Sequence, residues 1–166
     1  HLVVATGAQA AGELTGAYCP ATKGVVTHWF ATEVKPTDVT LLHVDARVRA
    51  SGPVLNTAVV SSVAPTYAPA GQHLVQASAL LRRGEVAPTE GEIRRHAGEL
   101  LGADPTRWRT VARYEVPDAL PIQLPPFSER RRVVVDRGVG RCGDHRDTAT
   151  IQGALVTARN RLDQAL

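Results

Sequence analysis

The apolar residues of this chain change their spacing near residue 89, and this change constrains the fold more than any other feature. Before it, short apolar runs at 24–34, 39–47, 52–65 and 71–81 are separated by turn-forming residues, which is typical of antiparallel strands. After it, Ile93, Ala97, Leu100 and Leu101 repeat at helical spacing. The pattern predicts an α+β fold: a mostly antiparallel sheet of about five strands with helices on one face.

The ends of the helix and the flanking segments can also be predicted. Thr89 and Glu92 have the spacing of a capping box, and Gly102 is a typical helix terminator. Strands are expected at 2–6, 108–116 and within 131–144, and a last helix near Thr150. Its expected apolar stripe consists of Ile151, Ala154, Leu155, Ala158 and Leu162. We expect the strand at 2–6 to need a neighbour from outside this chain.

The length of 166 residues predicts a single domain over 1–166. Within it, we expect the sheet to extend to about residue 133 and the closing strand and helix to begin at about residue 134. The net charge of +3 is a weak indication of an anionic partner, and the Arg130–Arg132 run is expected to be a solvated loop. Nucleic-acid motifs, metal-ligand spacings, a signal peptide and a membrane-spanning apolar run are absent from the sequence, so a cytoplasmic protein is expected.

The closing stretch from Gly140 to Leu166 has the chemistry of a ligand site. Gly143 permits close backbone approach, and the Asp144 carboxylate could accept hydrogen bonds from hydroxyls. Thr148 and Thr150 are both candidate helix caps, and the residues that follow have backbone N–H groups without a partner within a helix: Ile151, Gln152 and Gly153. A turn, a cap and close helix packing would explain the same residues without a ligand.

This stretch resembles the C-terminal signature of the FAD-dependent amine oxidase and phytoene desaturase-like flavoproteins. The resemblance implies that Gly143 and Asp144 contact the ribityl and phosphate part of FAD. It also implies that a set of residues at the helix start meets the pyrimidine edge of the flavin: Thr150, Ile151, Gln152, Gly153 and Ala154. The segment containing Leu120 and Pro121 would run close to the isoalloxazine. The likeness extends over nearly the whole chain, so residues 1–133 would form the substrate-binding sheet and 134–166 the flavin cap.

The sequence lacks the G-x-G-x-x-G unit with which this family binds the ADP half of FAD. We therefore expect weak FAD binding by this chain alone. A Met-free chain that begins at His1 is expected to be a fragment of a longer flavoenzyme or a shortened relative without the N-terminal dinucleotide-binding portion.

Several other residues could carry chemistry. Strand alternation places His28 and Phe30 on one face and Trp29 on the other, and one of these faces could line a substrate pocket. Asn56 could orient a substrate carbonyl, and Tyr67 lies in a proline-rich loop that could lean over a cavity. His145 lies between carboxylates and could act in acid–base catalysis, although a surface loop with local ion pairs explains the same residues. His43 and Asp45 share a strand face that we expect to be solvated.

Three functions remain open from the sequence. The first is part of an FAD-dependent oxidoreductase that acts on a small-molecule metabolite. The second is a cofactor-free cyclase or isomerase that uses His28, Asn56, Tyr67 or His145. The third is a non-catalytic module that forms a homodimer or binds another chain through an exposed strand edge.

Overall fold

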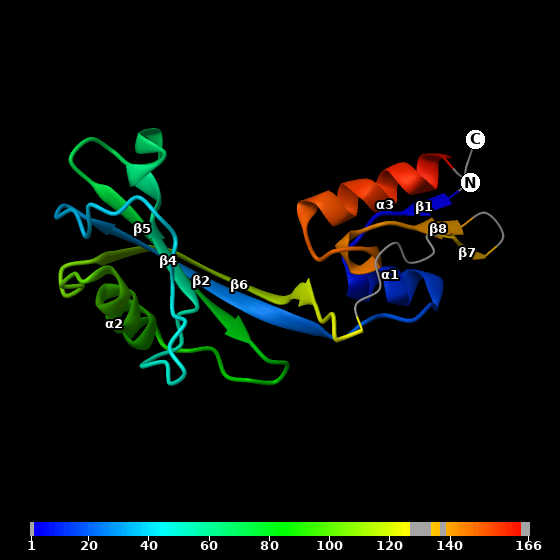
Figure 1. Cartoon of the computed structure of the whole chain (residues 1–166), viewed down its shortest axis with the longest axis horizontal. Helices are drawn as coiled ribbons and strands as arrows, with labels where there is room; N and C mark the ends of the chain where they lie inside the picture. The colour runs from blue at the N-terminus through cyan, green and yellow to red at the C-terminus, as the bar shows by residue number, and fades with distance from the viewer. Residues whose placement is uncertain (1, 127–133, 137–138, 164–166) are drawn as a thin grey trace. The chain divides into compact units, whose positions relative to one another are not determined.

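The computed structural model describes residues 2–126, 134–136 and 139–163 (Figure 1). In chain order its helices and strands are β1 (Leu2–Val4), α1 (Ala8–Thr15), β2 (Thr22–Thr32), β3 (His43–Val44), β4 (Asn56–Val59), β5 (His73–Leu81), α2 (Glu90–Leu101), β6 (Arg109–Pro121), β7 (Val134–Asp136), β8 (Val139–Arg141) and α3 (Ile151–Asp163). The Arg130–Arg132 run lies outside the described residues.

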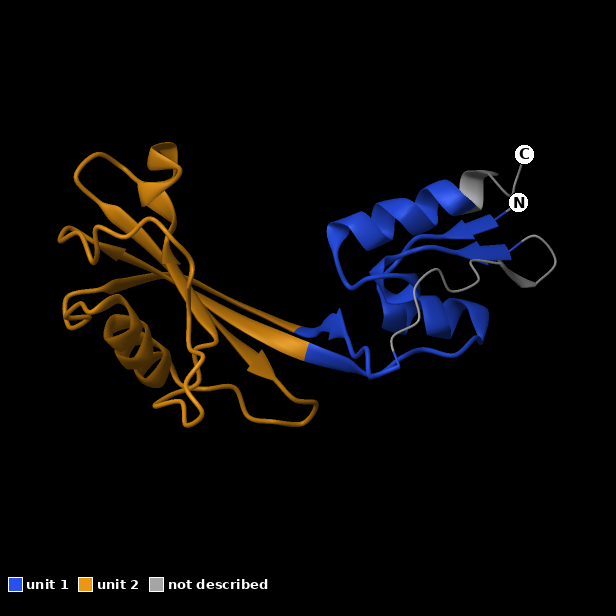
Figure 2. Ribbon diagram, viewed as in Figure 1, with its two compact units in different colours: residues 1–23, 117–166 blue, residues 24–116 orange. Residues whose placement is uncertain are grey.

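The chain divides into two compact units (Figure 2). Unit 1 comprises residues 1–23 and 117–166, and unit 2 comprises residues 24–116. Strands β2 and β6 begin in one unit and end in the other. The sequence-based expectation of one domain over 1–166 stays a prediction.

The main sheet has five strands in the order β3-β4-β5-β2-β6, and the pairs β3–β4, β4–β5 and β5–β2 are antiparallel. Helix α2 packs against β4 and β5 on one face of this sheet. The predicted α+β class, with an antiparallel sheet of five strands, is confirmed. The core of unit 2 lies between this face and α2, and its apolar members are Val26, Phe30, Val54, Val59, Val75, Ala77, Ala79, Leu81, Ile93, Ala97, Leu101 and Trp108.

Helix α2 begins and ends as its sequence predicts. The Thr89 side chain accepts the Glu92 N–H, while the Glu92 carboxylate accepts the Thr89 N–H at 2.8 Å, which completes the capping box. Gly102 ends the helix in the left-handed conformation with a φ of 68°. Both ends are therefore determined by local chemistry.

Two expected strands are much shorter than predicted. The run at 39–47 forms only the two-residue strand β3, because the Asp45 side chain turns to Arg47 and to His96 of α2. The run at 52–65 forms only β4, and 3-10 turns follow at Val60–Ser62 and Pro65–Tyr67. Polar contacts of Asp45 end the first strand, and the 3-10 turn that begins at Val60 ends the second.

Unit 1 contains a three-stranded sheet in the order β1-β8-β7. Strand β1 pairs with β8 in parallel, with Leu2 opposite Val139, whereas β7 and β8 are antiparallel. Leu2 and Val3 remain exposed on the edge strand β1. Figure 1 shows α1 and α3 on either side of this sheet.

The apolar stripe predicted for α3 is wrong at Ile151 and Leu155, while Ala154 and Ala158 are half-buried and the side chain of Leu162 lies outside the described residues. Ile151 is 77% exposed and Leu155 is 65% exposed, whereas Gly153 and Thr157 are buried. A hydrogen bond explains which face is buried: the Thr157 hydroxyl accepts the Gly143 N–H at 2.9 Å and holds this face of α3 against the preceding loop.

Among the described residues, every helix is too short or too polar to cross a bilayer.

Candidate functional site

The N-terminal tip of α3 carries unpaired backbone donors. The Thr150 hydroxyl accepts the Gly153 N–H at 3.1 Å, and the Thr150 carbonyl accepts the Ala154 N–H at 3.1 Å. Within the described residues, the N–H groups of Ile151 and Gln152 have no acceptor, and both residues are exposed. Two adjacent donors at the positive end of a 13-residue helix can therefore bind an electron-rich atom.

Gly143 is required by the fold of its own loop. Its φ is 150°, and a Cβ at this position would lie 2.8 Å from the His145 ring and 3.3 Å from the Thr6 carbonyl oxygen. The next residue, Asp144, begins a 3-10 turn, and its side chain is 31% exposed. Its carboxylate can therefore be reached from solvent.

Gly153 is also required by packing within the chain, because a Cβ there would collide with the Thr148 carbonyl oxygen and hydroxyl. The two glycines thus need no ligand to explain them. The groups that remain available to a flavin are the N–H groups of Ile151 and Gln152 and the carboxylate of Asp144.

His145 lies in a different environment from the one its loop position suggests. Its ring is buried, with 1% exposure, and Nδ1 lies 3.9 Å from Asp144 Oδ1. A ring so enclosed does not reach a substrate in this conformation. Contact with the Gly143 backbone, which the sequence does not reveal, explains the burial.

Leu120 and Pro121 lie at the end of β6, within unit 1. Leu120 is 37% exposed and Pro121 is buried. The strand is held here by a hydrogen bond from the Thr22 hydroxyl to Asp118 and by one of 2.7 Å from the Ile122 N–H to the Ala21 carbonyl. Of the two side chains, only that of Leu120 can meet a ligand.

The face of the five-stranded sheet opposite α2 carries a row of polar side chains. Residues paired across antiparallel strands share a face, which places Asn56 with Ser78 and Thr27. The Thr27 and Ser78 hydroxyl oxygens lie 2.6 Å apart, and Gln76 Nε2 donates to Asn56 Oδ1 at 3.4 Å. We call this side of the sheet the open face.

Two residues that the sequence singled out, Trp29 as a pocket candidate and Tyr67 in its proline-rich loop, meet on the open face. Trp29 and Tyr67 line one hollow of about 330 Å³ together with Leu74, Val111, Ala112 and Tyr114. A second hollow, of about 200 Å³, shares Tyr67, Leu74 and Val111 with the first and extends to Arg109. Unit 2 therefore holds a concave, largely aromatic and aliphatic surface.

His28 and Phe30 point the other way, into the core beneath α2. Phe30 is fully buried, its ring lies 5.8 Å from that of Trp108, and Arg94 covers it with its guanidinium 5.6 Å from the ring centroid. His28 stacks on Phe30 with ring centroids 5.9 Å apart. Neither residue lines the open face.

His28 should make the stability of the protein depend on pH. Its Nδ1 is buried without a hydrogen-bond partner, and burial, with a smaller contribution from Arg113, lowers the pKa of His28 below 6.5. The unfolded chain therefore binds a proton more readily, so this contribution favours unfolding as the pH falls below about 6.5. We expect a smaller loss of unfolding free energy between about pH 7 and 5 in His28→Leu.

Urea denaturation at several pH values would measure this effect. The wild type, measured at the same pH values, is the reference for this slope. An unchanged slope in His28→Leu would contradict the assignment.

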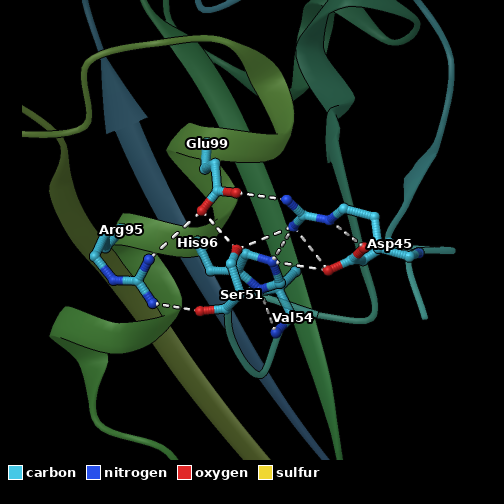
Figure 3. A network of polar contacts seen from close by, with 7 residues as sticks. Asp45, Ser51, Val54, Arg95, His96 and Glu99 are labelled. Atoms are coloured by element: carbon cyan, nitrogen blue, oxygen red, sulfur yellow. Dashed lines mark hydrogen bonds and ion pairs between the residues drawn. The ribbon is translucent and has the colours of Figure 1, made fainter. Parts of the chain in front are cut away.

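A buried polar network connects α2 with the loop before β4 (Figure 3). His96 is fully buried, and its Nδ1 accepts the Val54 N–H at 2.9 Å. The ring hydrogen therefore lies on Nε2, which is 3.0 Å from Asp45 Oδ2. The backbone of Gly52 packs on the ring, since a Cβ there would lie 2.6 Å from His96 Cγ.

Arg47 extends this network to the surface. It donates to Asp45 at 2.8 Å and to Glu99 at 2.6 Å, and these bonds lower the pKa of both carboxyl groups. Glu99 also accepts from the Ser51 hydroxyl at 2.6 Å, and Arg95 donates to the Ser51 carbonyl at 2.9 Å. These bonds enclose the His96 ring and join the loop before β4 to α2, so the network stabilises this loop.

Sequence reasoning missed His96, although a signal existed. It follows Ile93 by three residues, so it belongs to the buried stripe of α2. Among the described residues, no group of His, Cys, Asp or Glu is arranged to hold a metal ion.

Comparisons with known proteins give a fold relationship. No protein-family model and no curated protein matches the sequence. The structure is similar to that of an oxidoreductase from Methanosarcina mazei, with a TM-score of 0.59 and 15% identity. The match covers 94% of this chain and 37% of that chain.

The fold is that of part of an oxidoreductase structure. At 15% identity this likeness concerns the fold alone. A second match, to reduced UDP-galactopyranose mutase, has a TM-score of 0.42 and 10% identity over 65% of this chain and 23% of that one, which is too remote to carry an argument.

Proposed function

We propose that this chain is the substrate-binding and flavin-capping part of an FAD-dependent oxidoreductase that acts on a small-molecule metabolite. The observation that carries the proposal is the pair of unpaired N–H groups at Ile151 and Gln152, at the tip of a helix capped by Thr150. The likeness to an oxidoreductase over 94% of the chain supports it.

In this proposal the backbone at Ile151 and Gln152 donates hydrogen bonds to the pyrimidine edge of the flavin, where negative charge gathers on reduction. Asp144 accepts hydrogen bonds from the ribityl hydroxyls. FAD, when bound, accepts the hydride from the substrate.

The rest of the cofactor site belongs to residues beyond this chain. The sequence has no G-x-G-x-x-G unit, and the chain spans 37% of the oxidoreductase to which its fold is similar. A dinucleotide-binding portion preceding residue 1 would supply the contacts to the ADP half.

Ile151→Pro tests the helix tip in isolation. Proline at the first helical position removes one N–H and is well tolerated by the helix. Introduced into the full reading frame of the gene, it should weaken flavin binding about threefold to tenfold, the effect of one lost hydrogen bond. Flavin titration followed by the visible absorbance of the bound cofactor would measure the change.

Ile151→Ala is the matched control, because it trims the same exposed side chain and keeps the N–H group. We expect it to bind flavin like the wild type. If the full-length protein neither purifies with a flavin nor takes up added FAD, the proposed function is wrong.

A further inference from the structure

The hollows on the open face continue into a third hollow that carries positive charge. This hollow has a volume of about 220 Å³ and is lined by Ala31, Thr32, Glu33, Val34, Gln72, Arg107 and Arg109. It shares Ala31, Gln72 and Arg109 with the neighbouring hollow, which in turn shares Tyr67, Leu74 and Val111 with the hollow at Trp29. The three form one groove within unit 2, apolar at the Trp29 end and basic at the Arg107 end.

The two arginines at the basic end have no partner in the part of the chain that the structure describes. Among the described residues, neither Arg107 nor Arg109 forms a hydrogen bond or an ion pair. Glu33 lies on the same wall and offsets one of the two charges. Of the charged groups nearby, Lys35 is paired with Asp38 at 2.8 Å, and Asp104 accepts from the Thr106 N–H and hydroxyl.

We propose that this groove binds a small amphipathic acid, with an aromatic or alicyclic body against Trp29, Tyr67 and Val111 and a carboxylate on Arg107 and Arg109. Flat apolar rings pack well on the aromatic end. Guanidinium groups without internal partners bind a carboxylate through charge-assisted hydrogen bonds. The inference rests on unit 2 alone and holds whether or not unit 1 binds a flavin.

Two fluorescent dyes of matched shape test the proposal. Anilinonaphthalene sulfonate has an aromatic body and an anionic group that stands in for the carboxylate, while phenylnaphthylamine has the same body without charge. The purified chain should bind the sulfonate more tightly than the neutral dye. In the double variant Arg107→Gln, Arg109→Gln, the Kd for the sulfonate should rise roughly tenfold and that for the neutral dye should stay within about twofold.

Two further variants separate the groove from general charge and from unfolding. Arg82→Gln, Arg83→Gln removes the same charge at the other end of β5 and should leave both Kd values unchanged. Tyr67→Ala removes an exposed ring and should weaken the binding of both dyes. A thermal melt of each variant would confirm that the protein is folded, since the sulfonate also binds partly unfolded chains.

Three results would overturn the proposal. They are failure of the wild type to bind the sulfonate, an equal loss of affinity in the Arg82, Arg83 control pair, and unchanged sulfonate affinity in the Arg107, Arg109 pair. Because the flavin test uses variants of unit 1, its failure leaves this result unaffected.

Discussion

Replacing His96 by Phe should destabilise unit 2 by about 3 kcal/mol, because the substitution leaves the buried Val54 N–H without its acceptor and removes one of the two donors to Asp45 Oδ2, the other being Arg47. Phe is larger than His, so the variant opens no cavity, and crowding of its ring against the Gly52 backbone adds to the loss. Both tryptophans, Trp29 and Trp108, lie in unit 2, so urea denaturation followed by tryptophan fluorescence would measure the unfolding of this unit.

The matched control is His43→Phe, which changes a half-exposed imidazole on the edge strand β3. We expect it to change the free energy of unfolding by less than about 0.5 kcal/mol. A loss below about 1 kcal/mol in His96→Phe would mean that water or a rearranged loop satisfies the exposed partners.

Gly153→Ala should destabilise unit 1 by about 2 kcal/mol or more, although alanine is the better helix former. The added methyl group would collide with the Thr148 backbone, which must move to make room. Since that movement opens the contact between α3 and the 3-10 turn at Asp144–Arg146, the amide of Gly143 should exchange faster with solvent. Hydrogen exchange at this amide and thermal unfolding by circular dichroism would measure the two effects.

Gly91→Ala provides the opposite case within the same protein. A Cβ at Gly91, in the first turn of α2, meets no atom within 4 Å. Here the usual preference of helices for alanine should apply, with no loss and a gain of up to about 0.5 kcal/mol. Stabilisation by both substitutions would show that the close approach at Gly153 is not rigid.

The sequence predicts those elements whose determinants are close together in the chain. Both ends of helix α2 were predicted, because the residues that determine them lie at the ends themselves: Thr89 and Glu92 at the start and Gly102 at the end. Strands β2 and β5 were predicted from apolar runs bounded by turn-forming residues, and each alternates between a packed and an open face over most of its length. These signals need no knowledge of the rest of the fold.

Elements determined by distant partners could not be predicted from the sequence. Strand β3 is short because Asp45 binds His96, which lies 51 residues further along the chain. The buried face of α3 contains Thr157 because that hydroxyl binds the Gly143 backbone, so hydropathy gave the wrong stripe. At the candidate site, the sequence left Thr148 and Thr150 open as caps, and the Thr150 hydroxyl accepts the Gly153 N–H. Both alternatives for His145, an acid–base residue and a surface-loop residue, need an exposed ring, whereas the ring is buried.

Unit 1 is discontinuous in sequence, and this affects how the protein can fold during synthesis. Strand β1 must wait for β8, since Leu2 pairs with Val139, whereas every residue of unit 2 has been made by residue 116. On the ribosome we therefore expect residues 24–116 to become protected first, while the nascent segment 1–23 stays unpaired. The apolar side chain of Val4, which is buried in the folded unit, is then available to chaperones until β8 has emerged from the exit tunnel.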